Sequence, residues 1–217
     1  MTDSCQPIYN NRILKIGNPL ILTCPFCGKE KKIMSLVSGN TFDSELWSDN
    51  KQIAPMLPEI SYVQKCPHCG KYYIIRRQTV KFAKEGHSLE TGRLTFSKMK
   101  EAFAQLSEEG FIDKKEEGNI RMMLHHAYND YYYRIGLWNN IPEEDKILFR
   151  ENGLWLINNL LTDNVMKAEF YREIGDMETA KNILDSVVVE DGFQKQIVSS
   201  IRERIENNNC EVFKIRD

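Results

Sequence analysis

The sequence predicts an α+β protein in which a small N-terminal β module, residues 1–92, is followed by an all-α domain, residues 97–217. Two observations predict this division. In the first part, short β-favouring runs flank two copies of a Cys-Pro-x-Cys-Gly-Lys hexapeptide. After Ser97, apolar residues recur at intervals of three and four, which is the period of a helix that packs along one face. With 217 residues, 41% of them hydrophobic, the chain can fill one large and one small core.

The N-terminal part contains four candidate strands, one before and one after each hexapeptide. They cover residues 20–22, 32–37, 60–65 and 71–77. Between the two pairs lies an insertion, residues 38–59, that is rich in turn-forming residues and is expected to form a long loop or an extra hairpin. Trp47 and nearby apolar residues give it more apolar surface than a solvated loop needs. The insertion is therefore expected either to dock a partner or to fold back on the protein.

Four of the six cysteines lie in the hexapeptides CPFCGK and CPHCGK. These are Cys24, Cys27, Cys66 and Cys69. In such a turn the first thiolate precedes the bend, the second closes it, and the following glycine adopts a positive φ at no steric cost. Two turns together supply four thiolates, the tetrahedral ligand set of structural zinc. The sequence thus predicts one structural Zn²⁺ ion in a zinc-ribbon-like module with a long insertion between its two metal-binding turns.

The spacing between the cysteine pairs is unusual, because 38 residues separate them where about 15 to 20 are common. Doubling a loop costs only about 0.6 kcal/mol, whereas zinc contributes about 10 to 16 kcal/mol in small zinc peptides. The ligand prediction therefore stands. A single iron in the same thiolates and a thioredoxin-type redox pair remain alternatives. A catalytic zinc is not expected, since four protein ligands leave no position for water, and His68 is expected to face solvent.

The other cysteines, Cys5 and Cys210, lie alone near the termini and are expected to be unpaired thiols. No segment approaches the roughly 20 apolar residues of a membrane-spanning helix, and the first residues lack the pattern of a signal peptide. Together with the paired cysteines, these features predict a cytoplasmic protein that does not bind membranes.

The second part of the chain is expected to be helical throughout. The most regular helix is predicted over residues 120–135, with one face formed by Ile120, Met123, Leu124, Ala127, Tyr128, Tyr131 and Ile135. Further helices are expected to start at Pro142 and end near Leu161, and to cover residues 164–174, 177–188 and 191–207. The adjacent His125 and His126 lie about 100° apart on a helix, so they cannot chelate a metal together and are expected to pack or to face solvent.

One helix pair has the pattern of a known repeat. The stretch AEFYREIGDMETAKNILDSV resembles a tetratricopeptide (TPR) repeat through Ala168, Tyr171, Gly175, Asp176, Ala180 and Leu184. Tyr133, Arg134, Ile135 and Gly136 form a weaker echo. On this resemblance the domain is TPR-like over residues 120–207, with an ordinary helical bundle as the alternative. The hexapeptides, the segment LWSDNKQIAPMLPEI and the TPR-like tail together resemble a bacterial family of uncharacterised zinc-ribbon proteins, and this resemblance implies no activity.

Charge is distributed unevenly along the chain. Residues 1–100 hold 15 Lys and Arg against 8 Asp and Glu, and residues 101–217 hold 14 against 23, so the two parts carry net charges of +7 and −9. A zinc ion with four thiolates lowers the first value to about +5. The basic part either docks against the acidic part or presents a basic surface to a partner.

No nucleotide-binding glycine loop, serine-nucleophile elbow or HExxH helix is present, so the protein is not expected to be an enzyme. The leading hypothesis is a zinc-binding adaptor or scaffold that binds a protein or peptide. The alternative is a nucleic-acid-binding protein whose contact surface is the basic and aromatic strand at residues 71–77. The candidate contact residues for either partner are Lys71, Tyr73, Arg76, Arg77 and Trp47.

Overall fold

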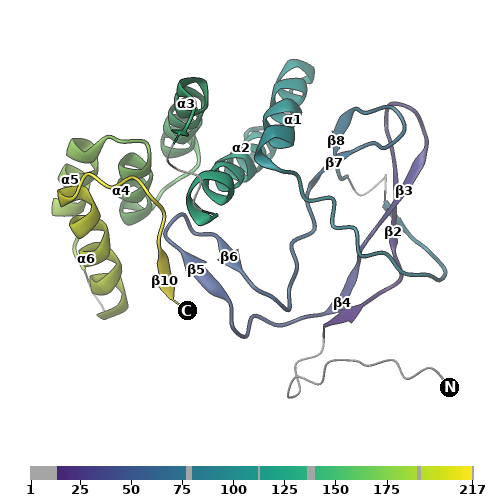
Figure 1. Cartoon of the computed structure of the whole chain (residues 1–217), viewed down its shortest axis with the longest axis horizontal. Helices are drawn as coiled ribbons and strands as arrows, with labels where there is room; N and C mark the ends of the chain where they lie inside the picture. The colour runs from purple at the N-terminus through teal and green to yellow at the C-terminus, as the bar shows by residue number, and fades with distance from the viewer. Residues whose placement is uncertain (1–13, 77–79, 112, 136–139, 190–191, 217) are drawn as a thin grey trace. The chain divides into compact units, whose positions relative to one another are not determined.

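The computed structural model describes residues 14–76, 80–111, 113–135, 140–189 and 192–216. Within them, short antiparallel strands come first along the chain and six α-helices follow (Figure 1), which confirms the α+β class. The chain divides into two compact units: Met1–Ser44 with Ile53–Arg93, and Glu45–Gln52 with Leu94–Asp217. Three residues discussed above, Cys5, Arg77 and Gly136, lie outside the described ranges.

The strands of the first unit form small antiparallel sheets. β1 (Lys15–Ile16) pairs with β4 (Leu36–Ser38), and β7 (Val63–Lys65) pairs with β8 (Tyr72–Ile74). In a three-stranded sheet, the central β2 (Leu20–Thr23) lies between β3 (Glu30–Ile33) and β9 (Val80–Phe82). The expected strands at 20–22, 60–65 and 71–77 thus correspond to β2, β7 and β8. The expected strand at 32–37 is divided between β3 and β4, and β9 was not predicted.

One cluster in the core of the first unit includes two of the cysteines. Leu22 and Ile33 from the three-stranded sheet are fully buried and pack with Tyr73 of β8 and with Cys24 and Cys66. A few partly buried aliphatic side chains surround this cluster. Because small modules bury little apolar surface, a unit of this length gains stability from an additional cross-link.

The second unit contains the helices. They are α1 (Phe96–Glu109), α2 (Lys114–Asn129), α3 (Glu143–Asn159), α4 (Asn164–Glu173), α5 (Met177–Asp185) and α6 (Gly192–Glu206). Aspartate side chains at the starts of α2, α4 and α5 accept hydrogen bonds from backbone N–H groups in the first turn, as N-caps do. Pro142 lies one residue before α3 instead of in its first turn, and α1 was not predicted as a separate helix. None of the helices in the described ranges has the length and apolar composition to cross a membrane.

The predicted apolar face of residues 120–135 is wrong at its C-terminal end. α2 continues as a π-helical turn, η2 (Asp130–Arg134), in which Tyr132 is buried while Tyr131 is 42% exposed and Ile135 is 64% exposed. Each residue of a π-helix rotates the chain by less than a residue of an α-helix does. The π turn therefore moves Tyr132 onto the buried face and Ile135 away from it.

Part of the insertion belongs to the second unit. β5 (Glu45–Trp47) pairs with β10 (Lys214–Arg216) near the C-terminus, with Lys214 opposite Trp47, and β6 (Gln52–Ile53) pairs with the other edge of β5. The insertion therefore contains a strand whose partner lies more than 160 residues away. The β5–β6 pair is the extra hairpin that was one of the two expectations for the insertion, whereas the pairing of β5 with β10 was not predicted.

Candidate metal centre

The two hexapeptide turns, here called the knuckles (residues 24–29 and 66–71), have the same backbone structure. In the first, the Cys24 N–H donates to the Lys29 carbonyl at 2.9 Å and the Gly28 N–H donates to the Cys24 carbonyl at 2.9 Å. The equivalent bonds of the second knuckle measure 2.9 and 3.0 Å. Gly28 and Gly70 have φ angles of 70° and 76°, so each turn uses the left-handed conformation that favours glycine.

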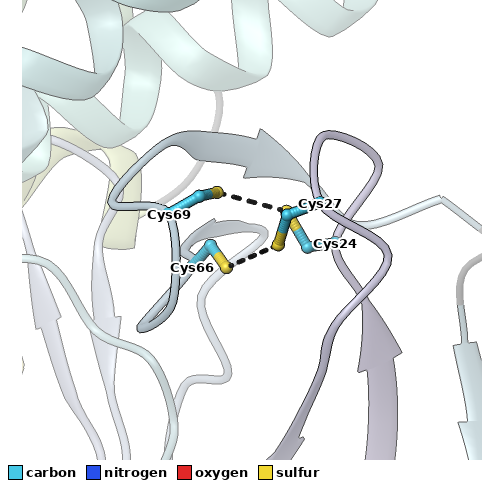
Figure 2. A group of neighbouring side chains, drawn as sticks. All are labelled: Cys24, Cys27, Cys66 and Cys69. Carbon is cyan, nitrogen blue, oxygen red and sulfur yellow. Dashed lines mark hydrogen bonds between the residues drawn. The ribbon is translucent and has the colours of Figure 1, made fainter.

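The four cysteine sulfurs converge between the knuckles (Figure 2). Cys24 Sγ lies 3.7 Å from Cys69 Sγ, and Cys27 Sγ lies 3.6 Å from Cys66 Sγ, so each of these contacts joins one knuckle to the other. All four sulfurs lie within 4.8 Å of one another. Cys24 and Cys66 are buried, whereas Cys27 and Cys69 are exposed.

These distances fit a tetrahedral metal centre. Four sulfurs at about 2.3 Å from one ion are separated from each other by about 3.8 Å, close to the 3.7 Å between Cys24 and Cys69 and the 3.6 Å between Cys27 and Cys66. A disulfide would need about 2.05 Å, and all four cysteines are free thiols. The cluster can therefore hold one metal ion, and its four sulfur ligands suit zinc or iron.

The knuckle backbones also stabilise negative charge on sulfur. Burial opposes ionisation of Cys66, but hydrogen bonds from the Cys69 and His68 N–H groups, aided by neighbouring thiols, outweigh it and lower its pKa to about 6. At Cys24 burial dominates and raises the pKa to about 12. Hydrogen bonds with the neighbouring Cys66 and Cys27 side chains also raise the pKa of Cys24. A cation at the centre reverses this effect, because it stabilises all four thiolates together.

Contacts around the knuckles link them further. The Lys71 ammonium of the second knuckle lies 4.6 Å from the centre of the Phe26 ring in the first. His68 Nε2 lies 3.4 Å from the Glu30 carbonyl, and His68 itself is exposed, as expected. Beneath the sulfurs, the Tyr73 hydroxyl is buried without a hydrogen-bond partner among the described residues, and burial next to the cysteines raises its pKa to about 12.

Comparisons with protein-family models, curated proteins and solved structures found no match to this chain.

The candidate partner-binding residues lie in different surroundings. Lys71 is exposed, but only 2% of Tyr73 is exposed, and its ring lies in the core of the first unit. Arg76 is half-buried, and Arg77 is outside the described residues. Trp47, on β5, belongs to the second unit, where its ring lies 4.8 Å from the Arg134 guanidinium. Of these candidates, the Tyr73 ring is thus not accessible at the surface of the first unit, and Trp47 is part of the other unit.

A second polar cluster, in the helical unit, was not predicted. His125 is fully buried between the rings of Phe149 and Phe170, with ring centres 4.5 and 4.3 Å away, and its Nε2 lies 2.8 Å from Glu173 Oε2. Burial lowers the pKa of His125 to about 4 and raises that of Glu173. The same Glu173 oxygen accepts a hydrogen bond from Asn129 at 3.0 Å. His125 was expected either to pack or to face solvent, and its buried position between two aromatic rings shows that it packs.

Proposed function

We propose that the four cysteines bind one structural zinc ion in a zinc-ribbon-like module, and that the protein is a non-enzymatic cytoplasmic adaptor for a protein partner. The convergence of the four sulfurs from two matching knuckles is the observation that carries the metal assignment. Four thiolates complete a tetrahedral zinc site and leave no position for a reacting water, which favours a structural role.

Zinc would hold together two knuckles whose first cysteines lie in one buried cluster. This cluster joins Leu22 and Ile33 to Tyr73, so strands from both ends of the insertion meet in it. Because the four thiolates come together only when the unit folds, the free energy of zinc binding contributes to folding itself. Zinc removal is therefore expected to unfold the first unit.

Exposed apolar side chains support the adaptor role. Four large apolar side chains in the first unit are more than 60% exposed: Val37, Phe42, Phe82 and Leu89. Single exposed apolar residues are ordinary, but two phenylalanines among them in a small β unit favour burial by a partner.

The TPR-like assignment is supported by the packing of α4 against α5. Ala168 and Ala180 are fully buried and let the two helices approach closely, and Gly175 has a φ of 84° in the turn between them. Tyr171 packs against the same core. Small residues at close helix contacts and a glycine at the turn are features that the repeat shares.

The adaptor proposal is tested by co-purification from the native host with matched variants. Phe82→Ser is expected to lose a protein that the wild type retains, whereas Val188→Ser, at a position 82% exposed in the helical unit, is expected to keep it. If no protein co-purifies with the wild type, or if both variants retain it equally, the surface around Phe82 is not the binding site.

Nucleic acid is the second candidate, because the three-stranded sheet presents a basic face. Lys32 and Lys81 lie opposite Ile21 on its two sides, and both lysines are exposed. Residues opposite each other in a sheet share a face, so the two ammonium groups flank Ile21. If this face binds single strands, affinity will fall steeply with salt and Lys32→Gln with Lys81→Gln will reduce the slope. A flat salt response excludes this function.

A further inference from the structure

Residues 45–52, here called the latch, connect the two units in an unusual way. In sequence the latch lies between the knuckles, but in the structure it belongs to the helical unit. The chain therefore leaves the first unit after Ser44, passes through the second, and returns at Ile53 to form the second knuckle.

Asp49 anchors the latch through its side chain. The carboxylate is fully buried, accepts a hydrogen bond from Asn129 Nδ2 at 2.9 Å, and forms an ion pair with Arg134. Its backbone carbonyl accepts a hydrogen bond from His126 Nε2 at 3.1 Å. Through Asn129 the anchor is connected to Glu173 of α4. The latch thus inserts a charged group into the polar cluster of the helical unit.

Other contacts hold the latch on both sides of Asp49. Lys51 Nζ lies 2.5 Å from Asp130 Oδ2, and both groups are largely buried. The Ser48 N–H donates to the Phe213 carbonyl at 2.9 Å, and the Phe213 N–H donates to Ser48 Oγ at 3.1 Å. The latch is therefore seated by side-chain and backbone bonds to α2, η2 and the C-terminal segment.

We propose that the latch couples metal binding at the knuckles to the stability of its seat in the helical unit. This inference rests on the proposed zinc site. Zinc binding brings the two knuckles together and so closes a loop, residues 30–65, that contains the latch. Seating of the latch in the helical unit closes a second loop, residues 53–93, that contains the second knuckle. The two loops share residues 53–65. Once one loop is closed, these residues have less conformational freedom, so closing the other loop costs less entropy. Coupling of this kind is reciprocal.

The polar character of the seat suits a reversible contact. When the latch leaves its seat, Asp49 and Lys51 become hydrated. Their interactions with water then replace much of the energy of the ion pairs and hydrogen bonds that they made in the seated state. Loss of the metal is therefore expected to release the latch without unfolding the helical unit.

Hydrogen–deuterium exchange of the full chain tests the first half of the coupling. After a chelator removes zinc, amides in residues 45–52 and 210–216 are expected to exchange at least fivefold faster, while those of α5 keep their protection. Unchanged exchange in the latch after complete zinc removal would overturn the proposal. Loss of protection in α5 as well would also overturn it, because the whole helical unit would then depend on the metal.

Zinc titration of two matched variants tests the reciprocal half. Asp49→Asn removes the anchor charge, whereas Glu59→Gln makes the same change at an exposed position of the insertion in the first unit. Asp49→Asn is expected to weaken zinc binding at least fivefold, the lower end of typical couplings, and Glu59→Gln by less than twofold. Equal affinities of both variants and the wild type refute the coupling while zinc binding stands. A wild type that binds no zinc refutes the proposed function itself.

Discussion

The knuckle glycines provide a quantitative test of the metal site. Gly28 and Gly70 have φ angles of 70° and 76°, and a Cβ placed at either position meets no atom within 4 Å. Substitution by alanine therefore adds no clash, and its cost is the conformational strain alone. For an L residue in the left-handed region this strain is roughly 1 to 2 kcal/mol.

This strain predicts the change in zinc affinity. The knuckle has to close before its two sulfurs reach the ion, so the cost opposes binding directly. Since about 1.4 kcal/mol corresponds to a factor of ten, either Gly28→Ala or Gly70→Ala is expected to weaken zinc binding about tenfold. The two turns are separate, so the double variant is expected to lose about a hundredfold.

Competition with a chromophoric chelator measures these affinities. Gly28→Asn is the matched control in the turn, because asparagine tolerates the left-handed conformation better than alanine, and it is expected to lose less affinity. Gly110→Ala is the control in the helical unit, with a φ of 82° and no atom within 4 Å of its added Cβ, and it is expected to leave zinc affinity unchanged. If the alanine variants bind zinc as tightly as the wild type, the turns do not have to close around the metal.

Three further predictions address the cysteines, the helical core and the buried carboxylate. Cys66→Ser is expected to abolish tight zinc binding and Cys210→Ser to leave one zinc per chain; equal losses would contradict the ligand assignment. Leu184→Ala, which truncates a fully buried side chain of α5, is expected to lower the free energy of unfolding in urea by about 3 kcal/mol, and Val188→Ala by less than about 0.5 kcal/mol. Burial disfavours the Asp49 carboxylate, but its charged and hydrogen-bonding neighbours outweigh this and lower its pKa from 3.8 to about 2. Its contribution is present above pH 4 and decreases by about 2 kcal/mol as pH falls to 2, so Asp49→Asn should remove this part of the dependence in urea titrations.

Local sequence patterns were sufficient to predict the knuckles and most helices. Pro25 and Pro67 follow the first cysteine of each knuckle and a glycine follows the second, so the turn chemistry is contained in six residues. The helices α3 to α6 begin within two residues of the positions expected from capping and periodicity. Information of this kind does not depend on the rest of the chain.

The latch could not be predicted because its contacts are far apart in sequence. Asp49 lies 80 residues from Asn129 and 85 from Arg134, and β5 pairs with a strand at the other end of the chain. Trp47 predicted that the insertion either docks a partner or folds back on the protein, and residues 45–52 do fold back, onto the helical unit, but nothing within them indicates which residues they contact. The same applies to His125, whose two stacking partners lie on α3 and α4.

X-ray absorption at the zinc edge, combined with metal analysis of freshly purified protein, tests the metal site most directly. We expect one zinc per chain, surrounded by four sulfurs at about 2.3 Å. A chain that contains no zinc and takes none up, or a zinc ion with nitrogen or oxygen among its ligands, would contradict this expectation.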